Sequence, residues 1–92
     1  MTNFLELITN TVSDLHQGGF IKDADELQQL GNLALDQTLS ATSRSRALKE
    51  IELRCHVKWL GDLYLPQLSI KDWWSRLEKL RRSTQKYMQS IY

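Results

Sequence analysis

The chain has 92 residues, of which 41% are hydrophobic and 25% charged, a balance typical of one small globular domain over residues 1–92. Its single cysteine excludes an internal disulfide, and no apolar run approaches the roughly 20 residues that a membrane-spanning helix needs. The N-terminal residues lack the basic segment and long apolar core of a signal peptide, so we expect a cytoplasmic protein without a membrane partner.

Charge is divided unevenly along the chain. Residues 1–43 carry one base and six acids, a net charge of −5, whereas residues 44–92 carry eleven bases and five acids, a net charge of +6. Such parts attract each other or partners of opposite charge, which favours a role in binding.

The first predicted helix covers about residues 3–17. Asn3, followed by Glu6 three residues later, is typical of a helix N-terminus, and apolar residues then recur at helical spacing. Gly18 and Gly19 end this helix, because glycine adopts the left-handed conformation of a helix C-terminus without a steric clash. The chain should therefore reverse direction at the glycine pair.

A second helix is predicted from Phe20, with an apolar face that continues to Thr38. Gly31 lies in the middle of this face, where it costs the helix about 1 kcal/mol relative to alanine. We therefore expect another helix to approach closely at this position.

The third predicted helix spans about residues 43–58 and is capped by Thr42 or Ser43. Its apolar residues lie on two sides, since Leu53 and Val57 point nearly opposite to the face that carries Ala47. Two interpretations stay open: the helix is central and buried on both sides, or Leu53 and Val57 belong to a partner interface.

The fourth predicted helix is the longest, from about residue 70 to 90, and Ser69 with Asp72 forms its capping box. Its apolar stripe consists of Ile70, Trp73, Trp74, Leu77, Leu80, Thr84, Tyr87, Met88 and Ile91. A basic stripe on the opposite face consists of Arg76, Lys79, Arg82 and Lys86. Strand signals are poor, so the sequence predicts an all-α fold: a four-helix, mostly antiparallel bundle built from two helical hairpins.

The stretch CHVKWLGDLYLP, residues 55–66, is the one irregular segment. Cys55 and His56 are adjacent on a helix and point about 100° apart, so they cannot form a side-by-side nucleophile and base without a distorted backbone. We interpret Cys55 as a small buried residue and the rest as a turn ended by Pro66. Trp59 and Tyr64 either cover the end of the bundle or are exposed anchors for another protein.

Enzymatic and metal-dependent chemistry is disfavoured by the residues present. The sequence contains no Gly-rich phosphate loop, no G-x-S-x-G and no H-E-x-x-H, and it has too few Cys and His residues for a structural zinc site. Asp23, Asp25 and Glu26 lie in a first helical turn, where acids are ordinary capping residues. We predict no enzyme, no catalytic residues, no metal and no cofactor.

A protein-binding module is the function that these observations favour. By size, helix content, the hairpin GGFIKDADEL and the pattern from CHVKWLGDLYLP to DWW, the chain resembles small helical bacterial immunity proteins and antitoxins. The resemblance implies direct binding and neutralisation of a toxin domain. The candidate partner-binding residues are Asp23, Asp25, Glu26, Asp36, Leu53, Val57, Trp59 and Tyr64.

Two other functions stay open. The basic stripe of the last helix could contact a few nucleic-acid phosphates, although the sequence pI of 7.9 is below that of dedicated binders. Alternatively, surplus apolar residues could form the interface of a homodimeric structural or adaptor subunit.

Overall fold

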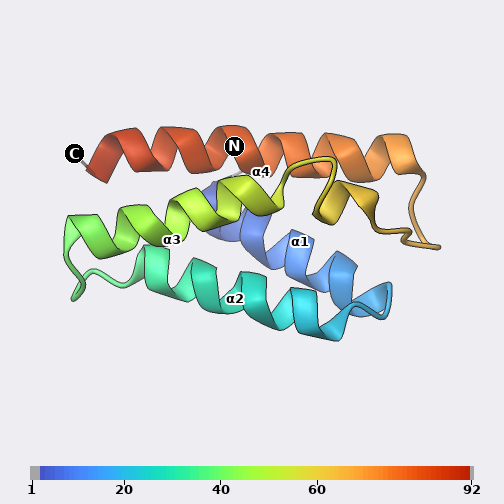
Figure 1. Ribbon diagram of the computed structural model, residues 1–92, viewed down its shortest axis with the longest axis horizontal. Coiled ribbons are helices and arrows are strands. Elements are labelled where there is room, and N and C mark those ends of the chain that lie inside the picture. Colours follow the sequence, from blue (N-terminus) through green and yellow to red (C-terminus); the bar gives the residue numbers. More distant parts are fainter. Residues whose placement is uncertain (1–2, 92) are drawn as a thin grey trace.

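The computed structural model describes residues 3–91, which form α1 (Phe4–Gln17), α2 (Ile21–Leu35), α3 (Ala41–Arg54), a short 3₁₀ helix η1 (Leu60–Asp62) and α4 (Ile70–Ile91). No strand occurs in this part of the chain. In Figure 1, α4 and α2 lie on opposite sides, and α1 and α3 each pack against both of them. The predicted all-α class and helical bundle are confirmed.

The bundle has a radius of gyration of 12.6 Å. A compact fold of this length has a radius of about 12 Å, so the four helices enclose one common core. Within residues 3–91, the helices are too short or too polar for any of them to cross a membrane.

Two of the predicted helix starts are confirmed. Asn3 Oδ1 accepts a hydrogen bond of 2.8 Å from the Glu6 N–H, and Ser69 Oγ accepts one of 3.1 Å from the Asp72 N–H. These side chains supply acceptors to N–H groups that have no partner within the first turn of their helix.

The predicted bounds of the middle helices were wrong by two to four residues. Ser40, and not Thr42 or Ser43, caps α3: its Oγ accepts a hydrogen bond from the Ser43 N–H at 3.2 Å. α3 therefore starts at Ala41, and it ends at Arg54 rather than at residue 58. α2 ends at Leu35, short of Thr38, because the Asp36 carboxylate accepts hydrogen bonds from the Thr38 N–H and hydroxyl group and folds a turn there.

The predicted close approach at Gly31 is confirmed. A Cβ atom at this position would lie 2.9 Å from Cγ2 of Ile8, which is fully buried in α1. A glycine is thus what allows α2 to pack closely against α1 at the middle of the bundle.

Each end of the bundle is closed by a polar contact between helices. At one end, Arg44 Nε donates to the Ala34 carbonyl at 2.9 Å, and Nη2 donates to the Tyr87 hydroxyl at 2.7 Å. The Tyr87 ring stacks on Phe4 with 5.1 Å between ring centroids. At the other end, the buried Trp73 indole donates to the Leu60 carbonyl at 2.8 Å.

Candidate protein-binding site

The connection between α3 and α4, residues 55–69, forms a corner that is anchored to α4. The His56 carbonyl accepts hydrogen bonds from the Trp59 and Gly61 N–H groups, which bends the chain into η1. Trp73 then donates its indole N–H to the Leu60 carbonyl and Trp74 to the Gly61 carbonyl, each at 2.8 Å. Two adjacent side chains of α4 therefore fix the position of the corner.

A groove of about 470 Å³ lies beside this corner, between the end of α3 and the start of α4. We call it the corner groove. Its rim carries three exposed apolar side chains, since 52% of Val57, 62% of Ile70 and 45% of Trp74 is accessible. Its lining also includes the buried Cys55 and Leu77. The groove is thus largely apolar, and Lys71, Ser75 and Glu78 complete its lining.

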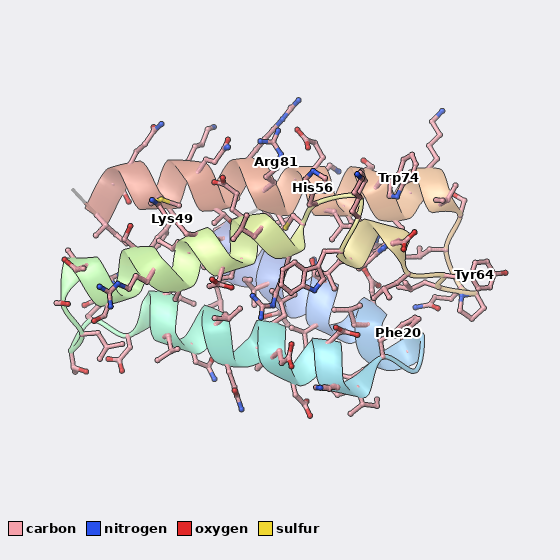
Figure 2. The ribbon with its side chains drawn as sticks, in the orientation of Figure 1. Phe20, Lys49, His56, Tyr64, Trp74 and Arg81 are labelled. Atoms are coloured by element: carbon pink, nitrogen blue, oxygen red, sulfur yellow. The ribbon has the colours of Figure 1, made fainter. Side chains whose placement is uncertain are left out.

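Tyr64 extends this apolar surface around the end of the bundle. It is 78% exposed and, in Figure 2, projects from the same end of the molecule at which Trp74 lies. A small neighbouring hollow of about 90 Å³ is lined by both Tyr64 and Ile70, so Ile70 connects Tyr64 to the corner groove. We refer to Val57, Tyr64, Ile70 and Trp74 as the corner patch.

Ile70 and Trp74 are members of the patch that the sequence interpretation missed. It assigned both to the apolar stripe of the last helix, but only Trp73, Leu77, Leu80 and Thr84 of that stripe are buried in α4. Adjacent helical residues point about 100° apart, so Trp73 and Trp74 cannot both face the same core. That spacing is the signal that could have identified Trp74.

Cys55 has the properties of a packed thiol, as the sequence interpretation expected. Burial raises its pKa to about 12, and only 6% of the residue is exposed. We predict that the native protein reacts with a thiol-specific disulfide reagent about 100-fold more slowly than the unfolded chain, because both thiolate formation and access are suppressed. Absorbance of the released thiol, with and without guanidinium, measures this; equal rates would contradict it.

Trp59 belongs to a different cluster from the corner patch. It is 44% exposed, and its ring lies 4.7 Å from the Arg54 guanidinium carbon. Arg54 also forms an ion pair of 2.8 Å with Glu50 and a longer one of 3.8 Å with Glu26 on α2. Trp59 and Glu26, both predicted to bind a partner, thus both contact Arg54. Leu53, the other predicted residue nearby in the sequence, is 55% exposed on α3.

The other predicted acidic residues are not gathered at one place. Asp23 and Asp25 lie near the start of α2, where Asp25 is 3.6 Å from His16. Asp36 is ten residues beyond Glu26, about 15 Å along the helix axis. Hydrogen bonds from Thr38 hold the Asp36 pKa below its ordinary value, and this carboxylate shapes the turn after α2. These four residues therefore do not form a single acidic surface.

The predicted basic stripe is exposed on α4, but two of its four charges are already paired. Arg76 lies 2.9 Å from the Asp14 carboxylate, and Arg82 lies 3.1 Å from Glu78. Lys79 and Lys86 are exposed on the same helix. Pairing lowers the charge that the stripe can offer to phosphate groups, which weakens the case for nucleic-acid binding.

The Asp14 and Arg76 pair gives a testable pH dependence. Burial raises the pKa of Asp14, and the Arg76 guanidinium offsets this only in part. The folded form thus takes up a proton more readily than the unfolded chain, so this group's contribution to stability falls as pH rises through the raised pKa. In urea unfolding between about pH 3 and 6, the stability of the wild type relative to Asp14→Asn should decrease with pH; an increase would contradict this.

Within residues 3–91, no group of three or more His, Cys, Asp or Glu side chains is placed to hold a metal ion. The chain shows no significant match to a protein-family model, to a curated protein or to a solved structure. The features of the molecule that bear on function are therefore the geometry of the corner patch and the distribution of charge.

Proposed function

We propose that this protein is a non-catalytic protein-binding module that contacts its partner through the corner patch. The observation that carries the proposal is the exposure of four large apolar side chains, three of them at the corner groove and the fourth, Tyr64, at the hollow beside it. Interfaces gain most of their binding energy from a few such residues, and tryptophan and tyrosine are especially frequent among them.

The support beneath the patch favours the same function. Trp74 presents one part of its ring to solvent while its indole N–H is held by the Gly61 carbonyl. The contacts at both ends of the helices support the mostly antiparallel bundle that the sequence predicts, and such a bundle is a rigid base. A pre-ordered side chain loses little conformational entropy on binding, so more of its contact energy contributes to affinity.

The concrete role that we propose is that of a bacterial immunity protein or antitoxin, which acts in the cytoplasm and neutralises a toxin domain by direct binding. The small helical fold and the division of charge between the two parts of the chain support this role. Charge of this kind accelerates encounter with a complementary partner, which an inhibitor needs in order to act before the toxin does.

The proposal is tested by affinity capture from a lysate of the source organism, with nuclease-treated and untreated samples washed at low and high salt. The wild type, Ile70→Glu and Leu33→Glu serve as baits. Leu33 is a matched control, because it is 47% exposed on α2, away from the patch. We expect one stoichiometric protein on the wild type and on Leu33→Glu, and a loss of about tenfold or more on Ile70→Glu.

Three outcomes would contradict the proposal. Equal recovery on all three baits would remove the corner patch from the interface. Recovery of nucleic acid alone, released by moderate salt, would instead assign function to the basic stripe. Recovery of only further copies of the bait, through the same patch, would indicate a homodimeric subunit.

A further inference from the structure

Gly61 is a buried residue of η1 whose backbone forms hydrogen bonds on both sides. Its N–H donates to the His56 carbonyl at 3.2 Å, and its carbonyl accepts the indole N–H of Trp74 at 2.8 Å. A glycine at a structured position has either a conformational role or a steric role, because it lacks a Cβ atom. The geometry around Gly61 distinguishes the two.

Conformation does not require a glycine at this position. Among residues 3–91, the only residue with a positive φ is Gly19, at 89°. Gly61 therefore has a φ that residues with side chains also adopt. What sets Gly61 apart is the space around its Cα atom.

A side chain on Gly61 would crowd two members of the corner patch. Its Cβ atom would lie 3.3 Å from the Trp74 Nε1, 3.3 Å from the His56 carbonyl oxygen and 3.4 Å from the Val57 Cβ. The two shorter distances are tighter than ordinary van der Waals contact, so one of these groups would have to move by a few tenths of an ångström. The absence of a Cβ atom thus leaves the space that the indole occupies.

Trp74 is the group that is free to move. The His56 carbonyl accepts two hydrogen bonds within the corner, and the neighbouring Leu60 carbonyl is held by the buried Trp73. The Trp74 residue is 45% exposed, so its ring lacks packing on one side. Crowding at Gly61 would therefore displace the indole and weaken its hydrogen bond.

We infer that Gly61 is a positioning residue of the corner patch: the absence of a side chain there keeps the Trp74 indole on the Gly61 carbonyl and at the rim of the corner groove. The inference rests on the proposed function and adds to it a buried residue that acts through Trp74. An indole that leaves this position must be ordered again when a partner binds, which reduces affinity.

The test is Gly61→Ala, followed through the indole N–H signals in the NMR spectrum. The three tryptophans give three such signals, which are assigned from single tryptophan-to-phenylalanine variants. Exchange of the Trp74 indole N–H with water should become about threefold to tenfold faster, as expected for the loss of one hydrogen bond. Exchange at Trp73 should change by less than about twofold, because its bond to Leu60 is not crowded.

Gly18→Ala is the matched control for crowding of the corner. Gly18 has a φ of −78°, and a Cβ atom there would lie 3.0 Å from Cγ of Leu65, which belongs to the same connection between α3 and α4. This variant should leave the exchange of the Trp74 indole N–H unchanged, since Trp74 is not among the groups that its Cβ atom would meet.

Affinity capture from the source lysate then links the indole to binding. At a temperature where circular dichroism shows full helicity, Gly61→Ala should recover about threefold less partner than the wild type. Unchanged exchange at Trp74, equal acceleration at Trp73 and Trp74, or undiminished recovery of the partner would overturn the inference. If the wild type captured no partner, the proposed function would fail, and indole exchange would still decide whether Gly61 positions Trp74.

Discussion

Replacement of Trp73 by alanine should destabilise the protein by about 3 to 5 kcal/mol, whereas the same change at Trp74 should cost only about 1 to 2 kcal/mol. Both indoles donate an N–H group to a backbone carbonyl of the corner at 2.8 Å. The difference lies in burial, since 1% of Trp73 but 45% of Trp74 is exposed. Only Trp73→Ala leaves a cavity in the core.

Thermal unfolding followed by circular dichroism measures this difference. In a domain of this size, 1 kcal/mol corresponds to about 4 to 8 °C, so Trp73→Ala should lower the Tm by well over 10 °C. Trp74→Ala should remain folded at room temperature and lose partner binding. Equal losses of stability for the two variants would show that the corner is organised differently from the structure described.

Replacement of Arg44 by alanine should destabilise the protein by about 2 to 4 kcal/mol. Its guanidinium donates to the Ala34 carbonyl at the end of α2 and to the Tyr87 hydroxyl on α4, and it lies 5.8 Å from the centroid of the Tyr87 ring. One side chain of α3 thus connects two neighbouring helices at the end of the bundle far from the corner patch.

Arg46 is the matched control for Arg44, because it is exposed on the same helix two residues later. Arg46→Ala should change the free energy of unfolding by at most about 0.5 kcal/mol. Urea unfolding of both variants measures the contrast. Arg44→Lys should recover only part of the stability, since an ammonium group cannot reproduce the planar, forked geometry of the guanidinium. Equal stability of Arg44→Ala and Arg46→Ala would contradict this role.

The sequence correctly predicted those features of the fold, such as two helix caps, that depend only on residues close together in the chain. Asn3 and Ser69 were identified as caps because each is followed by an acid three residues later. The cap of α3 was misplaced because Ser40, Thr42 and Ser43 are all suitable types within four positions. Residue type alone does not choose among them; in the structure it is Ser40 that has the extended backbone and the hydrogen bond of a cap.

For the candidate site, too, the sequence predicted what depends on local residues and missed what depends on tertiary contacts. Val57 was predicted as an interface residue from the helical projection of the third helix and Tyr64 from the composition of the corner, and both are exposed. The contact of Ile70 with both hollows depends on how the corner folds back on α4, which helical periodicity does not describe. The pairing of Arg76 with Asp14, 62 residues away in sequence, could not be inferred from the basic stripe itself.

The most direct test of protein binding by the corner patch is site-specific photocrosslinking in cells of the source organism, with a photoreactive phenylalanine analogue at Ile70 or at Leu33. Both positions are exposed, but only Ile70 lies in the corner patch. If the corner patch binds a partner protein, we expect one discrete protein adduct from Ile70 and none from Leu33. The same adducts from both positions, or none from Ile70, would contradict a protein-binding role for the corner patch.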